Sequence, residues 1–264
     1  MDESTHTEAS VVALGMFDGV HVGHQVLLNK AKKLAEKHGV PLVVQTFAQH
    51  PLCLIDPTRC PPQLTTYAER IACLEKAGVD ILYAPPFTEA MRDMPPEDFV
   101  GHLVRRWRPC AAVVGFDYSF GRGGDGTPAM LHTLGHALGF ETSVVPEIRV
   151  AGIGVSSTYI RGLLAEGKTD VARYFLGRAY ARGAALHPDH TVGRLILCWE
   201  RDNKQAVGPG TYRCVLQSGD KAFPALVSIT DGGKVFARVA GEPALANDMG
   251  VSFFAERENW TATR

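Results

Sequence analysis

Two histidines in a glycine-rich stretch are the first residues of this chain whose types and spacing can do chemistry. The stretch reads GMFDGVHVGH at residues 15–24, and it directly follows the apolar run Val11–Leu14. Glycines in a turn from strand to helix let the backbone approach a phosphate, and a helix N-terminus offers N–H donors to it. The imidazoles of His21 and His24 could donate to oxygens that gain negative charge in a transition state. The spacing therefore indicates a binding site for a nucleotide triphosphate. The alternative is that the two histidines are ordinary polar residues at the start of a helix.

A second such segment reads VSSTYIR at residues 155–161 and opens another helical pattern. The hydroxyls of Ser157 and Thr158 are expected to cap this helix, and hydroxyls at a helix N-terminus also bind phosphate. Arg161 follows one turn later, and its planar guanidinium suits the oxygens of a departing pyrophosphate better than an ammonium would. Taken alone, the segment is explained slightly better by a helix cap with a surface arginine.

The elements that must position these residues alternate between short apolar runs and amphipathic helical patterns over the first two thirds of the chain. Such alternation predicts an α/β fold, a doubly wound parallel sheet with crossover helices (Rossmann-like). The expected strands are Val11–Leu14, Leu42–Thr46, Ile81–Ala84, Ala112–Gly115 and Ser143–Val145. The expected helices cover residues 24–38, 66–77, 96–107, 128–138, 157–166 and 170–176, with Gly39 ending the first.

After Arg178 the helical period disappears and short alternating runs follow one another. The strands expected here cover residues 194–199, 211–216, 225–229, 234–239 and 251–255, separated by Gly, Pro and Asp. This pattern predicts a smaller antiparallel β-barrel-like domain. We therefore expect a disordered N-terminus at residues 1–10, an α/β domain at residues 11–183 and a β domain at residues 184–264.

The composition is that of an ordinary globular protein. Of 264 residues, 45% are hydrophobic and 21% charged, which excludes extensive disorder. Lys and Arg total 27 against 28 Asp and Glu, so nothing indicates a nucleic-acid partner. No apolar run approaches the roughly 20 residues that span a bilayer, and the acidic start is unlike a secretory signal. We expect a cytoplasmic protein with small-molecule substrates and no membrane partner, its oligomeric state left open with a homo-oligomer as one option.

The cysteines show no paired spacing. They are Cys53, Cys60, Cys73, Cys110, Cys198 and Cys214, with no CxxC motif among them. Neither a disulfide framework nor a zinc site is indicated by such spacing. We expect reduced thiols and no metal ion held by the protein's own side chains.

The order of the motifs resembles the HxGH nucleotidyltransferase superfamily, and more narrowly the FMN adenylyltransferase module of bacterial bifunctional riboflavin kinase/FAD synthetases. The resemblance rests on GMFDGVHVGHQ, VVQTFAQHP, the long block at residues 64–100, VVGFDYSFGRGG, VSSTYIRGLLAEG and ARYFLGRAY. These stretches cover roughly residues 11–183 in the family's order. Their combination is more specific than any one of them.

The resemblance implies a reaction without a protein nucleophile, in which the phosphate of FMN attacks the α-phosphorus of ATP and releases pyrophosphate. It implies that His21 and His24 contact the triphosphate, with His24 stabilising the transition state. Ser157, Thr158 and Arg161 would bind the β- and γ-phosphates. Mg²⁺ would be held mainly by phosphate oxygens.

The same resemblance assigns the other site residues. The catalytic set would be His21, His24 and Arg161. The nucleotide would also be bound by Gly15, Phe17, Asp18, Gly19 and Ser156. The acceptor would be bound by Phe47 and His50 in a flap after the second strand, and by Asp117, Tyr118 and Phe120 in a later loop.

Two departures from the family pattern leave alternatives open. The flap has Ala48 and Gln49 where the family usually carries an acidic residue and a proline, which puts FMN as the acceptor in question. The stretch after Gly193-Arg194 lacks the Pro and Thr of the kinase motif Gly-Phe-Pro-Thr-x-Asn, and residues 234–239 lack its catalytic glutamate. We therefore expect an FMN adenylyltransferase with a degenerate riboflavin-kinase-like domain and no kinase activity. The alternatives are a paralogue that uses another phosphorylated acceptor and a catalytically silent flavin- or nucleotide-binding regulator.

Overall fold

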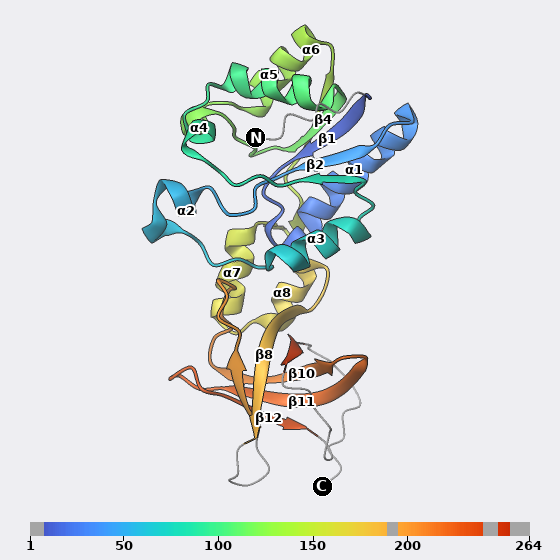
Figure 1. Ribbon diagram of the computed structural model, residues 1–264. Helices are drawn as coiled ribbons and strands as arrows, with labels where there is room; N and C mark the ends of the chain where they lie inside the picture. Colours follow the sequence, from blue (N-terminus) through green and yellow to red (C-terminus); the bar gives the residue numbers. More distant parts are fainter. Residues whose placement is uncertain (1–7, 189–194, 240–247, 254–264) are drawn as a thin grey trace. The chain divides into compact units, whose positions relative to one another are not determined.

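The computed structural model describes residues 8–188, 195–239 and 248–253 (Figure 1). The chain divides into two compact units. The first contains Met1–Pro61 and Tyr67–Val155, and the second contains Pro62–Thr66 and Ser156–Arg264.

The first unit is built on a parallel sheet with the strand order β3-β2-β1-β4-β5. Its strands are β1 (Ser10–Leu14), β2 (Leu42–Gln45), β3 (Ile81–Tyr83), β4 (Pro109–Gly115) and β5 (Glu141–Val145). The chain moves outward from β1 in one direction and then returns to add β4 and β5 on its other side. In sheets of this kind, ligands bind at the carboxyl ends of the strands where the order reverses, here β1 and β4.

Helices cover both faces of this sheet because β1 is apolar on both sides. Val11 and Ala13 pack in one buried cluster with α1 (Val22–His38) and with Leu74 of α3 (Tyr67–Lys76). Val12 and Leu14 pack in a second cluster with α5 (Pro96–Trp107) and α6 (Pro128–Leu138). The expected doubly wound α/β fold is confirmed.

Several expected element boundaries agree with the structure. The helices α5 and α6 have the expected bounds, and α1 ends at Gly39, whose left-handed φ of 64° and backbone N–H complete the cap. The strand β1 begins at Ser10, within the expected N-terminal tail, whereas residues 1–7 of that tail lie outside the described residues. Further short elements are η1 (Asp18–Val20), α2 (Leu52–Ile55), η2 (Pro57–Arg59), α4 (Glu89–Arg92), η3 (Arg122–Gly124), β6 (Arg149–Val150) and β7 (Ile153–Gly154).

The second unit combines two helices with a closed antiparallel barrel. The helices are α7 (Ser157–Ala165) and α8 (Thr169–Leu176), and the ring of Tyr159 meets that of Phe175 edge-on at 5.0 Å. The barrel order is β10-β11-β12-β9-β8-β13. Its strands are β8 (Tyr180–Pro188), β9 (Leu195–Trp199), β10 (Gly210–Ser218), β11 (Lys221–Ile229), β12 (Val235–Val239) and β13 (Asp248–Phe253).

The strand β8 is not among the strands that the sequence predicts, because the first strand expected in the β domain begins at residue 194. Its sequence, YARGAALHP, is rich in alanine and has Gly183 in the middle, so it lacks the β-branched residues typical of strands. It forms because β9 and β13 both pair with it. The expected domain boundary at residues 183/184 stays a prediction, and Gly193, Arg194 and Ala255 lie outside the described residues.

No helix in the described part of the chain combines the length and the apolar character that crossing a bilayer requires.

Candidate active site

The turn between β1 and α1 has a backbone shape that few residues adopt. Phe17, Gly19 and Val20 have φ values of 51°, 78° and 40°. Positive φ is costly for a residue with a Cβ, and most unusual for a β-branched one. Two local contacts hold the turn: the side chain of Phe17 is fully buried, and the N–H of Val20 donates to the carbonyl of Phe17 at 3.1 Å. Strain of this kind persists only where surrounding packing imposes it, as it often does at functional sites.

Two further glycines leave room for aromatic rings in this turn. A Cβ at Gly15 would lie 3.3 Å from the ring of Phe17, and a Cβ at Gly23 would lie 3.3 Å from the ring of His21. Neither position could take a side chain without moving a buried ring. The glycine spacing therefore serves packing as well as any approach to a phosphate.

His21 caps helix α1. Its Nδ1 accepts a hydrogen bond from the backbone N–H of His24 at 3.3 Å, and its side chain is buried. A neutral imidazole that accepts through Nδ1 carries its proton on Nε2. The cap therefore fixes which nitrogen of His21 is the donor.

His24 lies one turn into α1, stacked on His21. The two ring centroids are 3.6 Å apart and the ring planes differ by 11°, while the ring of Phe17 lies 5.2 Å from that of His24. The Nδ1 atom of His24 is buried and has no hydrogen-bond partner among the described residues. Burial, and secondly the nearby His21, hold the pKa of His24 well below its ordinary value. His24 is therefore a neutral imidazole at pH 7.

The phosphate segment opens α7 in the second unit, and the expected cap was wrong by one or two residues. Ser156, not Ser157 or Thr158, is the capping residue, because its side chain accepts from the N–H of Tyr159 at 3.2 Å. Ser157 and Thr158 are instead the first two helical residues. Arg161 follows on the same helix, and its Nε donates to the carbonyl of Pro62 at 2.7 Å.

The expected flap follows β2 and is tied down at several points. The ring of Phe47 meets that of Phe87 edge-on at 5.0 Å, and Nδ1 of His50 accepts from the N–H of Leu52 at 3.2 Å, at the start of α2. Cys53 and Cys60 form a disulfide across α2 and η2. The expectation that all cysteines are reduced thiols was therefore wrong for this pair. The spacing gave no signal because the two short helices bring the sulfurs together.

The loop after β4 places its expected site residues in different environments. Asp117 is exposed, whereas Phe120 is only 5% exposed and packs in the second buried cluster. The ring of Tyr118 stacks on that of Phe120 at 5.8 Å, and burial raises the pKa of its phenol well above the ordinary value. Phe116, which the sequence reading passed over, is an exposed aromatic residue at the carboxyl end of β4.

Sequence reasoning also missed a buried arginine between the turn and the flap. Arg70 of α3 is 3% exposed. Its Nη1 donates to the carbonyl of Met16 at 3.0 Å, and its Nη2 donates to the carbonyls of Phe47 and Ala48, both at 2.8 Å. The available signal was its place on the helix, four residues before the buried Leu74 and so on the same face.

Comparisons with known proteins identify a family and several relatives that this chain resembles. A family model described as FAD synthetase matches residues 3–159. A bifunctional riboflavin kinase/FMN adenylyltransferase of Listeria monocytogenes is 36% identical over 189 residues, 69% of this chain and 60% of that protein. One of Escherichia coli K12 is 31% identical over 230 residues, 84% of this chain and 73% of that protein.

A solved structure is similar in fold over most of its length. It is titled a macrolide-efflux protein from Streptococcus pneumoniae, is 25% identical, covers 94% of this chain and 93% of its own, and has a TM-score of 0.83. The chain spans about 60% of the length of the Listeria relative and of a similar Bacillus subtilis one.

Proposed function

The chain belongs to the FAD synthetase family, and from this membership we propose that it transfers the adenylyl group of ATP to FMN, forming FAD and pyrophosphate. A phosphate oxygen of FMN forms a bond to the α-phosphorus of ATP, and the bond from that phosphorus to the α,β-bridging oxygen breaks. The electron pair leaves with pyrophosphate, so no protein nucleophile is needed. The observation that carries the proposal is the strained turn with its stacked, neutral His24.

His21 and His24 act on the triphosphate as donors in this proposal. Because Nδ1 of His21 accepts from the backbone, its Nε2–H is the group that can donate. A neutral His24 donates an N–H but carries no positive charge. A positive charge would bind the triphosphate as tightly in the ground state as in the transition state, and so would not lower the barrier. Hydrogen bonds that strengthen as charge builds on the phosphoryl oxygens lower the barrier. Gly15, Phe17, Asp18 and Gly19 shape the turn that receives the nucleotide.

The helix α7 has the features of a phosphate-binding helix. With the side chain of Ser156 engaged in the cap, Ser157 and Thr158 lie in the first turn of α7, where a helix N-terminus favours phosphate. We assign to them and to Arg161 the β- and γ-phosphates. Mg²⁺ would be held mainly by phosphate oxygens, the ligands that this hard cation prefers at a triphosphate. The ion supplies charge neutralisation when bound.

The acceptor residues Phe47, His50, Asp117, Tyr118 and Phe120 differ in what they offer. The ring of Phe47 packs on that of Phe87, and Asp117 is exposed; we assign both residues to direct contact with the flavin. The rings of Tyr118 and Phe120 stack on each other in the loop after β4, and Phe120 is buried. Ala48 and Gln49 replace the usual flap residues, and a different phosphorylated acceptor is therefore the second candidate.

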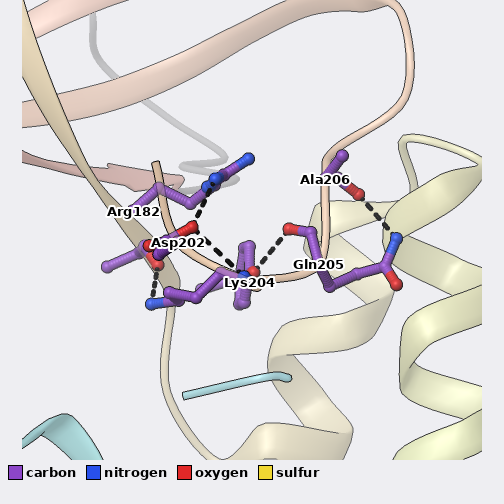
Figure 2. A network of polar contacts seen from close by, with 7 residues as sticks. Arg182, Asp202, Lys204, Gln205 and Ala206 are labelled. Carbon is purple, nitrogen blue, oxygen red and sulfur yellow. Dashed lines mark hydrogen bonds and ion pairs between the residues drawn. The ribbon is translucent and has the colours of Figure 1, made fainter. Parts of the chain in front are cut away.

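We propose further that the barrel has no riboflavin kinase activity. Figure 2 shows Asp202, just after β9, between Arg182 of β8 and the backbone of Lys204. The Arg182–Asp202 ion pair is 2.8 Å long and largely buried, and Nζ of Lys204 donates to the carbonyl of Ala181 at 2.6 Å. The kinase motif Gly-Phe-Pro-Thr-x-Asn is expected after Gly193-Arg194, and in this chain that stretch leads through β9 to Asp202, whose carboxylate is bound to the barrel itself. The strand β12, VFARV, has no carboxylate.

The test is product identification. The purified protein is incubated with ATP and Mg²⁺, with FMN in one tube and riboflavin in another, and the products are separated by chromatography and identified by mass spectrometry. We expect FAD from FMN and nothing from riboflavin. FMN or FAD formed from riboflavin would contradict the kinase proposal alone. Absence of FAD from FMN would contradict the adenylyl transfer proposal and direct the search to other phosphorylated acceptors.

A further inference from the structure

Arg70 joins two loops that are far apart in the sequence. Through Met16 it holds the turn between β1 and α1, and through Phe47 and Ala48 it holds the flap after β2. The Met16 carbonyl accepts a second hydrogen bond from Oγ1 of Thr46, at 3.1 Å. One backbone carbonyl of the turn is therefore bound both by the helix α3 and by the residue with which the flap begins.

The chemistry of the contact requires a guanidinium. Nη1 and Nη2 of Arg70 point to different loops at 2.8 to 3.0 Å, and a planar fork holds those two directions at a fixed angle. A lysine ammonium offers donors from one point on a flexible stem, so it would reach one loop at a time.

Arg70 is also kept charged where burial disfavours it. Burial lowers its pKa from the ordinary value, while the carboxylate of Asp18 and the phenol of Tyr67 act in the opposite direction. The guanidinium lies over the ring of Tyr67, with 5.5 Å from Cζ to the ring centroid. Moving this buried cation would leave its charge without the backbone carbonyls that solvate it, which costs free energy. The contact therefore keeps the turn and the flap at a fixed distance from each other.

We infer that Arg70 is a positioning residue, which sets the flap that receives the acceptor against the turn that receives the nucleotide. The inference rests on the proposed function, because that function makes the turn and the flap the two substrate sites. An in-line displacement depends on alignment of the two reactants, and a misplacement of about 1 Å can lower the rate by about 100-fold. The role of Arg70 is therefore in kcat rather than in the affinity for either substrate.

The kinetic test uses Arg70→Met and Arg70→Lys, with Arg106→Lys as the matched control. Arg106 of α5 is another arginine of the first unit, stacked on Tyr83 at 4.0 Å and on Trp107 at 5.1 Å. We expect kcat to fall about 10- to 100-fold in both Arg70 variants with smaller changes in KM, and to stay near wild type in the control. Millimolar guanidinium should restore part of kcat in Arg70→Met. A wild-type kcat in folded Arg70→Lys or Arg70→Met would overturn the inference.

A second measurement does not depend on turnover. Trypsin cuts after exposed arginines such as Arg59, at the end of η2 in the flap, and because the Cys53–Cys60 disulfide joins the two fragments, the cut is read on a reducing gel. If Arg70 transmits nucleotide binding to the flap, ATP should slow this cut in wild type and not in Arg70→Lys. Equal protection by ATP in both proteins would overturn the inference while leaving adenylyl transfer untouched. A wild-type protein that shows protection but makes no FAD would contradict the proposed function alone.

Discussion

At the scale of single residues, the site depends on imidazoles in contrasting roles. Nδ1 of His21 accepts the hydrogen bond that caps the helix, whereas Nδ1 of His24 is buried and has no partner in the described structure. The two ring centroids are only 3.6 Å apart, so a positive charge on one ring would disfavour a positive charge on the other. In the proposed function the pair acts as neutral N–H donors, which suits a ligand that itself carries the negative charge.

Replacing His24 tests its role in the chemistry. We expect His24→Ala to lower kcat/KM for FAD formation by about 100- to 1000-fold, the range found when one transition-state donor is removed. Circular dichroism should show that the variant still folds. The control is His38→Ala, at the exposed end of the same helix, which should leave the kinetics unchanged. Full activity in folded His24→Ala would contradict the assigned role.

The lowered pKa of His24 also predicts how stability depends on pH. The folded-state pKa lies below the unfolded value near 6.5, so between these values the unfolded chain binds more protons than the folded protein. The stability contributed by the neutral ring is therefore complete above about pH 6.5 and is lost as the pH falls toward the folded-state pKa. Thermal midpoints between pH 7.5 and 5 should fall more for wild type than for His24→Gln. Identical pH profiles for the two proteins would show that His24 titrates normally.

At the scale of elements, the turn between β1 and α1 combines positive φ at Phe17, Gly19 and Val20 within four residues. Burial of the Phe17 side chain offsets part of the free energy of that strain. The side-chain Nε2 of Gln25 also stabilises the turn, because it donates to the Val20 carbonyl at 2.9 Å. Arg70 adds the contact from α3. The element is thus held by three separate parts of the fold, and its shape should be sensitive to any one of them.

Gly19 offers a direct test of that shape. Gly19→Ala places a Cβ on a residue with φ of 78°, which should reduce the free energy of unfolding by about 1–2 kcal/mol and kcat/KM by about 10- to 100-fold. The matched control is Gly39→Ala, which has φ of 64° at the end of α1 and nothing within 4 Å of the added Cβ. Urea denaturation should show a similar loss in both, but only Gly19→Ala should lose activity. Equal kinetics in the two variants would mean that the turn tolerates the change.

At the scale of the whole molecule, the chain pairs an α/β unit with a barrel in which Arg182, Asp202 and Lys204 contact one another or the barrel's own strand β8. Arg182 is 6% exposed and lies over the ring of Trp199 at 5.1 Å as well as pairing with Asp202. Lys204 lies over the ring of Tyr180 at 5.2 Å. We interpret this network as a structural core that now occupies the stretch from which the family's kinase chemistry comes.

A double-mutant cycle tests this interpretation. Arg182→Met leaves the carboxylate of Asp202 buried and unpaired, so the barrel should lose about 3–5 kcal/mol of stability in urea denaturation. Adding Asp202→Asn removes that charge while retaining an acceptor for the N–H of Lys204, and should restore part of the loss. None of the variants should phosphorylate riboflavin. A double variant as unstable as Arg182→Met would contradict a dominant role for the ion pair.

The sequence alone determined the class of fold, the strands of the parallel sheet and the longer helices of the first unit, and the position of the histidine turn. These are local properties, since periodicity, caps and glycine spacing are set by neighbouring residues. Only the tertiary structure decided which residues far apart in the sequence contact one another, and how short segments such as α2 and η2 turn. Arg70 meets Met16 across 54 positions, the strand β8 exists because β9 and β13 pair with it, and the Cys53–Cys60 disulfide depends on how two short helices turn. Contacts of this kind are chosen by packing in three dimensions, which leaves no period in the sequence.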